Sequence, residues 1–150
     1  MKKYQYRFEK VLVYREQEKT ETEIEYKEAV QTFEIVATQL YDLLKKKEDT
    51  LEEQQEKMMT GFMINEIHHY SRFIESLEKR IVVTQQQVIQ ARSKMTWFED
   101  KLLEKTLEVR KFEKMKEKDH EHHRTEMEQL EAIQLDELAT LKFRRRENGW

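Results

Sequence analysis

The sequence predicts an all-α fold, a long two-stranded antiparallel coiled-coil hairpin whose second helix is longer than its first. Three observations support this prediction. The 150 residues contain no proline, and Gly61 is the only glycine outside the last few residues. Apolar side chains recur about every 3.5 residues on both sides of Gly61. Since proline and glycine stop and turn a backbone, the sequence indicates two unbroken helices with a single reversal.

The composition favours a thin coiled coil over a globular domain. Charged residues make up 39% of the chain and hydrophobic residues 37%, and the mean hydropathy is −0.99. These values are too polar for a thick core, yet the apolar residues are too regularly placed for disorder. We expect residues 1–150 to form a single hairpin, with a first helix at about 5–57, a turn at about 58–64 and a second helix at about 65–145.

Charge and cysteine content narrow the functional classes. Lysine and arginine total 28 against 31 aspartate and glutamate, and the net charge of −3 predicts no general attraction to nucleic acid or membranes. There is no cysteine, which excludes disulfides and thiolate chemistry. No apolar run approaches the roughly 20 residues that span a bilayer, and MKKYQYRFEK lacks the apolar segment of a secretory signal. We therefore expect a soluble cytoplasmic protein without direct membrane insertion.

The heptad pattern identifies the expected contact positions of both helices. An alternating spacing of four and three residues predicts a left-handed supercoil with these side chains in the seam. In the first helix the seam positions are Phe8, Leu12, Arg15, Lys19, Thr22, Tyr26, Ala29, Phe33, Val36, Leu40, Leu43 and Lys47. In the second helix they are Ile67, Tyr70, Ile74, Leu77, Ile81, Thr84, Val88, Ala91, Met95, Phe98, Leu102, Lys105, Val109 and Phe112.

The segment KMMTGFMIN (57–65) is the expected turn. Gly61 can adopt the positive φ that ends a helix, and Asn65 is a candidate cap for the next helix. A short connection makes the two helices antiparallel neighbours. Folding about Gly61 places Leu40 opposite Ile81, Phe33 opposite Val88 and Phe8 opposite Phe112, so apolar residues meet along most of the hairpin.

The seam has one polar section. Arg15 faces Lys105 there, and Lys19 and Thr22 extend the polar stretch. The favoured interpretation is that the long cationic side chains reach out to solvent and lay their stems along the seam. The alternative is a soft section that can bend or rearrange.

The second helix is expected to extend beyond the first by roughly 30 residues, or about 45 Å. The stretch KMKEKDHEHHRTEME (114–128) is predicted to be a solvated or frayed helix. Beyond it lies an apolar stripe, accompanied by Phe143, that the first helix cannot cover. The stripe consists of Leu130, Ile133, Leu138 and Leu141. An uncovered apolar stripe bordered by charge usually marks a contact with another chain, here either a different partner or a second copy.

The sequence offers no evidence for catalysis. The chain has too little glycine for a phosphate-binding loop, and a two-stranded coil offers no deep pocket for catalytic residues or a cofactor. His120, His122 and His123 lie near Asp119 and Glu121, but only Asp119 and His123 share a face, so we expect a solvated polar stretch and no metal site. The basic run KFRRR (142–146), followed by Trp150, resembles a nucleic-acid patch, although it also complements the helix dipole. We expect no nucleic-acid binding.

Three segments carry a family resemblance. The first is the aromatic opening YQYRFEKVLVYREQEK (4–19), and the second is the glycine turn with an aromatic-rich helix start, GFMINEIHHYSRFIESLEKRI (61–81). The third combines VRKFEKMKEK (109–118) with LDELATLKFRRR (135–146). In this order and spacing they resemble the FliJ family, small coiled-coil components of the bacterial flagellar type III export apparatus.

The resemblance implies a stalk that enters the hexameric flagellar export ATPase, contacts the cytoplasmic domain of the export gate and binds export chaperones. It also implies a location in the cytoplasm, peripherally at the membrane of the flagellar base. The implied ATPase-binding residues are Phe8, Leu12, Arg15, Phe112, Lys116, Asp136, Glu137, Phe143 and Arg144. The implied gate-binding residues are Gln39, Leu43, Phe73 and Leu77, whereas Lys46, Thr50, Arg80 and Thr84 depart from the family pattern.

Two further hypotheses remain open at this point. The chain could be a generic coiled-coil tether that binds a partner helix through the stripe of Leu130, Ile133, Leu138 and Leu141. It could also be the stalk of a related machine, such as a virulence injectisome or a vacuolar-type rotary ATPase.

Overall fold

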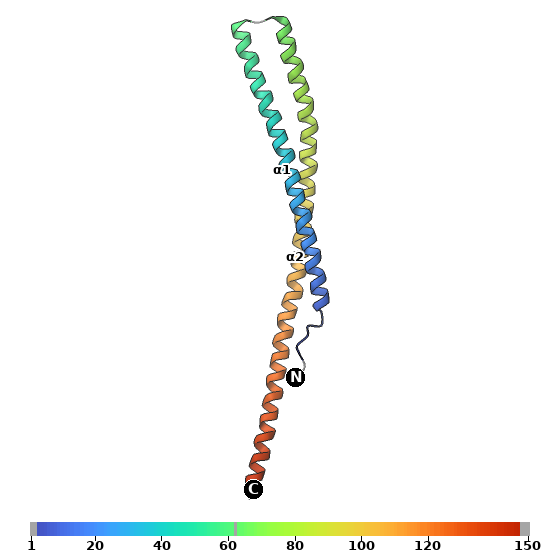
Figure 1. Ribbon diagram of the computed structural model, residues 1–150, viewed down its shortest axis with the longest axis vertical. Helices are drawn as coiled ribbons and strands as arrows, with labels where there is room; N and C mark the ends of the chain where they lie inside the picture. The colour runs from blue at the N-terminus through green and yellow to red at the C-terminus, as the bar shows by residue number, and fades with distance from the viewer. Residues whose placement is uncertain (1–2, 62, 148–150) are drawn as a thin grey trace. The chain divides into compact units, whose positions relative to one another are not determined.

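Two long helices make up almost all of the computed structural model, which describes residues 3–61 and 63–147. Helix α1 (Glu9–Thr60) has 52 residues and helix α2 (Ile64–Glu147) has 84, and the described residues form no strand. Figure 1 shows the two helices with their connection at the end of α1. The predicted all-α hairpin with a longer second helix is confirmed.

The turn depends on Gly61. Its φ is +84°, in the left-handed region that glycine adopts without a steric penalty, and α1 ends at the preceding Thr60. The backbone N–H groups of Glu66 and Ile67 both donate to the carbonyl of Met63, at 3.0 and 3.3 Å. Helix α2 therefore begins directly after Met63. The predicted cap at Asn65 is wrong, because Asn65 already lies within the first turn of α2.

The chain divides into two compact units, each containing parts of both helices. One unit combines the residues up to Lys19 with those from Lys105 onward, and the other is Thr20–Glu104. In both units the predicted seam is confirmed residue by residue, because every heptad position named above is buried or half-buried. Neither helix has, within the described residues, an apolar stretch long enough to cross a membrane.

In the unit Thr20–Glu104 the core is a narrow line of side chains between the helices. Ala29, Ile81 and Ala91 are buried, and Leu77 is completely inaccessible to solvent. The seam threonines Thr50 and Thr84 are also buried, and each hydroxyl donates to the carbonyl four residues earlier in its own helix. These polar groups therefore enter the seam without an unpaired hydrogen-bond donor.

Cross-helix contacts in the same unit show the antiparallel register. Lys47 Nζ lies 3.4 Å from Glu78 Oε1, and Lys57 Nζ lies 3.9 Å from Glu66 Oε2. As the residue number rises on α1 it falls on α2. These ion pairs border the seam and are partly exposed, so they specify the register more than they add stability.

The other unit begins with a non-helical segment, residues 3–8, that lies against α2. Tyr6 is buried and its hydroxyl donates to the carbonyl of Phe112 at 3.2 Å. The Phe8 carbonyl accepts the N–H of Leu12 at 2.9 Å and so closes the first turn of α1. The predicted helix start near residue 5 is therefore four residues too early, because the contacts of Tyr6 with α2 hold this segment outside the helix.

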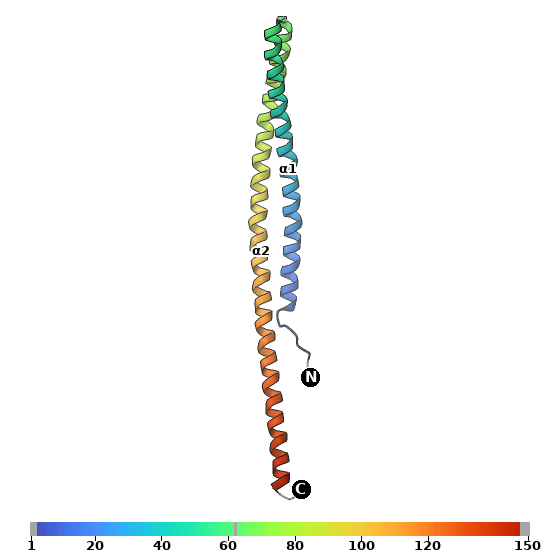
Figure 2. The same ribbon diagram turned by 90° about the vertical axis from the view of Figure 1, so that its left-hand side faces the viewer.

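Helix α2 continues past the contacts that the described N-terminal residues 3–8 make with it. The last such contact is the ring of Tyr4 against that of His123, at 5.2 Å between centroids. Beyond it, residues 124–147 are helical and exposed, except for the half-buried Met127. Figures 1 and 2 show this part of α2, coloured orange to red, running on alone past the blue N-terminal residues of the same unit. We call residues 124–147 the overhang.

The inaccessible position of Leu77 leads to a stability prediction. Replacing Leu77 by alanine should lower the free energy of unfolding by about 3 kcal/mol, because it removes buried methyl groups and leaves a cavity in a thin seam. Leu103→Ala is the matched control: Leu103 lies on the same helix but is 59% exposed, so it should cost about 0.5 kcal/mol or less. Urea unfolding followed by circular dichroism measures both. Equal losses for the two variants would contradict the seam described here.

Candidate functional site

The polar section of the seam is organised by Glu18. Its carboxylate oxygen Oε2 lies 2.8 Å from Lys105 Nζ and 3.3 Å from Arg15 Nη1. The side chain of Glu18 is only 18% exposed. The two cations that the sequence places opposite each other therefore share one acidic partner. The side chains of Arg15 and Lys105 were expected to reach out to solvent, but they form ion pairs with Glu18 instead.

The electrostatics of Glu18 follow from that arrangement. The hydrogen bond from Lys105, followed by one from Tyr14, lowers the pKa of Glu18 from about 4.5 to about 2. The same cluster raises the pKa of Tyr14, chiefly through its hydrogen bond to Glu18. A carboxylate that remains ionised over nearly the whole pH range keeps the section between Arg15 and Lys105 neutralised.

Tyr4 holds the N-terminal segment at the base of the overhang. Its hydroxyl donates to Asp119 Oδ2 at 2.9 Å, and its ring meets the rings of His120 and His123 at 4.9 and 5.2 Å. Burial, and then the hydrogen bond to Asp119, raises the pKa of Tyr4 to about 12. His120 was expected to point away from His123, but both rings contact Tyr4.

The third histidine of this stretch is separate. His122 Nε2 lies 3.0 Å from Glu126 Oε1, one turn further along α2. The described residues contain no group of three or more side chains that could hold a metal ion. In this structure, His120 and His123 contact Tyr4, whereas His122 does not take part in that contact.

The candidate ATPase-binding residues fall into two groups. Phe8, Leu12, Arg15, Phe112 and Lys116 lie together near the start of α1, where the rings of Phe8 and Phe112 are 6.5 Å apart. They make contacts within the hairpin: Leu12 is only 4% exposed, and Lys116 Nζ pairs with Glu9 Oε2 at 2.9 Å. A partner therefore meets only the outer edges of this group while the hairpin is closed.

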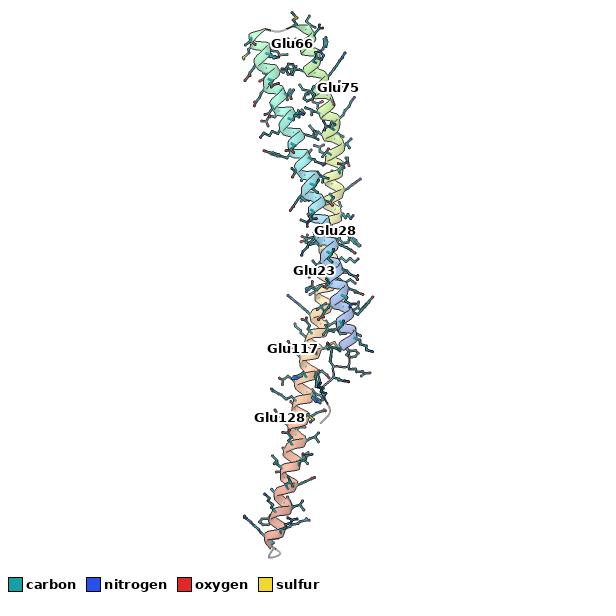
Figure 3. All side chains as sticks on the ribbon, in the orientation of Figure 1. Glu23, Glu28, Glu66, Glu75, Glu117 and Glu128 are labelled. Atoms are coloured by element: carbon teal, nitrogen blue, oxygen red, sulfur yellow. The ribbon has the colours of Figure 1, made fainter. Side chains whose placement is uncertain are left out.

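The second group lies on the overhang and is exposed. It consists of Asp136, Glu137, Phe143 and Arg144, together with the stripe residues Leu130, Ile133, Leu138 and Leu141. Phe143 is 62% exposed and each stripe residue is more than half exposed. Leu135, which the predicted stripe does not include, is more exposed than any of the four stripe residues. Figure 3 shows the side chain of Glu128 on this part of α2, with no second helix beside it.

A shallow groove runs along one side of the overhang. It has a volume of about 440 Å³ and brings acidic, basic and apolar side chains together over about three turns of helix. Its lining residues are Ile133, Asp136, Glu137, Thr140, Leu141 and Arg144. The basic run continues to Arg146, whereas Trp150, its predicted aromatic companion, lies outside the described residues.

The candidate gate-binding residues lie in the unit Thr20–Glu104. Gln39 and Leu43 line a shallow groove of about 710 Å³, together with Lys46, Arg80 and Thr84, which depart from the family pattern. Phe73 is partly exposed and Lys46 Nζ lies 5.5 Å above its ring. Leu77 and Thr50 are both buried in the seam. The accessible part of the predicted gate surface is therefore Gln39 and Phe73.

Comparison with known proteins decides the family. The family model described as "Flagellar FliJ protein" matches residues 4–148. This chain belongs to the FliJ family. The flagellar FliJ protein of Bacillus subtilis (strain 168) is 36% identical over 140 residues, covering 93% of this chain and 95% of that protein. No solved structure matches. Membership of the FliJ family makes the chain a component of the flagellar export system.

Two features of this FliJ-family chain escaped sequence reasoning. Glu18 lies one turn after Arg15, so the spacing was a usable signal, but heptad analysis examines seam positions and Glu18 borders the seam. The predicted first helix included Tyr6 and began directly after Tyr4, whereas both tyrosines dock residues 3–8 onto α2. Both features depend on which α2 residues lie opposite, which only the packed hairpin determines.

The lowered pKa of Glu18 predicts a specific acid sensitivity. Because its pKa is lower in the folded chain, Glu18 contributes stability above its ordinary pKa of about 4.5 and loses it as the pH falls towards about 2. Glu18→Gln should lower the urea midpoint at pH 7, and the difference from the parent chain should vanish near pH 2. Glu21→Gln, an exposed carboxylate on α1, is the control. A pH-independent difference for Glu18→Gln would contradict this role.

Proposed function

We propose that the chain is a non-enzymatic stalk of the flagellar export apparatus, which binds the hexameric export ATPase and promotes its assembly and activity. The observation that carries the proposal is the overhang, in which an exposed apolar stripe extends past the contacts that residues 3–8 make with α2. An exposed apolar surface of this kind needs a partner. Membership of the FliJ family supplies the flagellar context.

The two groups of candidate residues have different tasks in this proposal. Leu12, Phe8 and Phe112 hold the chain ends together as a paired base, because they are turned towards each other. Phe143 and Arg144, with Asp136 and Glu137, offer accessible apolar and charged groups to the ATPase. The base positions the overhang and the overhang makes the contact.

We also propose that the unit Thr20–Glu104 binds the cytoplasmic domain of the export gate. The groove beside Gln39 carries Lys46, Lys79 and Arg80 against a single carboxylate, Asp42, with Leu43 and Val83 as apolar floor. Such a lining suits an acidic partner segment with some apolar side chains. This contact would hold the protein in the cytoplasm, peripherally at the membrane of the flagellar base. Export chaperones are further proposed partners.

The ATPase proposal is tested with the purified cognate hexamer. Adding the chain should raise its rate of ATP hydrolysis, and Phe143→Ala should increase the concentration needed for half-maximal stimulation about tenfold, as expected for an exposed aromatic anchor. Ile35→Ala, an equally exposed apolar residue on α1, should leave stimulation unchanged. The absence of any effect of the parent chain on hydrolysis or on ring assembly would rule the proposal out.

The gate proposal is tested separately. Phe73→Ala should weaken binding to the isolated cytoplasmic domain of the gate about tenfold while stimulation of the ATPase persists. Trp97→Ala is a close control, because Trp97 is an exposed aromatic of the same unit with Lys101 Nζ 5.0 Å above its ring. Isothermal titration calorimetry measures both variants. Equal weakening by the two substitutions would argue against a gate surface at Phe73.

The tether hypothesis is a second candidate, favoured by the exposure of the stripe itself. A tether captures a partner helix without changing the turnover of any enzyme. Deleting the residues after Glu128 would then abolish partner capture and leave the hairpin folded, while the parent chain would not alter ATP hydrolysis. Membership of a flagellar family argues against the stalk of an injectisome or of a vacuolar-type ATPase.

A further inference from the structure

Acidic and basic side chains are separated along the overhang, and the proposed stalk function does not explain this separation. Its first turns are acidic, with Glu126, Glu128 and Glu131, and its last turns carry Lys142 and Arg144–Arg146. All of these side chains are exposed. Acidic groups early and basic groups late in one helix are complementary to the same helix running in the opposite direction.

The apolar face of the overhang is also complementary to the same helix running in the opposite direction. At 3.6 residues per turn, Met127, Leu130, Leu138 and Leu141 share one face, with Gln134 between them. An antiparallel second copy, with its two-fold axis near residues 135–136, sets Leu130 against Leu141 of the other copy. Gln134 then lies beside Leu138, so an apolar residue enters every layer from 130 to 141.

The flanking charges meet in the same register. In an antiparallel pair the same side of each helix meets, which brings Glu126 close to Arg144 and Glu131 close to Lys142 of the other copy. In a parallel pair, each basic residue would instead face the same basic residue of the other copy. Glu126 already contacts His122 within its own helix, at 3.0 Å, and Glu128 lies 3.9 Å from Arg124. These exposed contacts are weak and leave the carboxylates accessible.

Residues 124–147 also fit the pairing in length. The register pairs residue 124 with residue 147, so the paired segment ends where Tyr4 begins to cover α2 at His123. It is 24 residues long, or about 36 Å of helix. No contact of the N-terminal segment described here has to open.

We propose that the overhang binds a second copy of this chain as an antiparallel helix pair, through Leu130, Leu138 and Leu141 with Glu131 and Lys142 at its edges. Self-pairing covers the stripe when no other partner is present. If the proposed function also holds, the pair and the ATPase compete for the same face.

The test uses the full chain alone, so it is independent of any ATPase. Sedimentation equilibrium should show a concentration-dependent dimer. Leu141→Asp should abolish the dimer, because it places a carboxylate between two leucine-lined faces. Leu103→Asp, at a leucine of similar exposure in the other unit, should not change it. A monomer at every concentration up to about 100 μM, or a dimer that survives Leu141→Asp, would overturn the proposal.

A charge exchange tests the register. Glu131→Lys and Lys142→Glu each create two repulsive contacts in the dimer, and each should weaken it on the order of tenfold. The double variant restores opposite charges across the pair and should recover the parent affinity. A parallel pair would show no such recovery, because like residues would still face each other, and that outcome would refute the antiparallel register.

Cysteine cross-linking locates the contact directly, since the chain has no cysteine of its own. A mixture of Leu130→Cys and Leu141→Cys chains should form a mixed disulfide dimer on oxidation. Leu130→Cys alone should not, because its two copies lie about 16 Å apart along the pair, beyond disulfide reach. Efficient cross-linking of Leu130→Cys to itself would contradict the model of pairing.

Discussion

The seam between α1 and α2 is the constraint on which the remaining features depend. A helix of this composition gains little stability from its own hydrogen bonds and is held by packing of its apolar face. The side chains of Leu12, Leu77 and Val109 are almost fully removed from water, yet the core is only one side chain wide. Such a core tolerates no interruption, which explains why proline is missing and why the reversal is confined to Gly61.

The thin core also explains why polar residues in the seam have hydrogen-bond or ion-pair partners. The hydroxyl groups of Thr50 and Thr84 donate to carbonyls of their own helices. Arg15 and Lys105 share the carboxylate of Glu18.

The same constraint separates stability from binding. The side chains that face the seam are buried between the two helices. Family-matched positions such as Leu12 and Leu77 therefore stabilise the hairpin and offer no surface to a partner. Binding is left to side chains that border the seam or lie beyond it. Among the proposed binding residues, Gln39 and Phe73 are of the first kind, and Phe143 with Arg144 of the second. The proposed stalk therefore needs only a paired base and an accessible extension, and the chain has both.

The overhang has two candidate uses that share one surface. Its exposed leucines need cover, and its charges are arranged so that a second copy could provide it. A different partner that offers more contact area would displace that copy. Under these two proposals, the free chain and the assembled export apparatus would differ in what covers Leu130 and Leu141.

The sequence by itself determined the helical class, the seam and the position of the turn, because heptad spacing and the single interior glycine depend on local rules. It also determined that α2 outlasts α1, since the apolar pattern after Gly61 is longer than the pattern before it. The three segments that carried the family resemblance all lie within residues 4–148, which the FliJ family model matches. The tertiary structure alone decided the helix start at Glu9 and the role of Glu18. Both depend on groups brought together by packing: Tyr6 with the Phe112 carbonyl, and Glu18 with Lys105. The start of α2 is a local matter, because the Met63 carbonyl accepts from residues three and four positions later, which places Asn65 inside the helix. A one-dimensional pattern shows which face of a helix is buried, but not which atoms lie across from it.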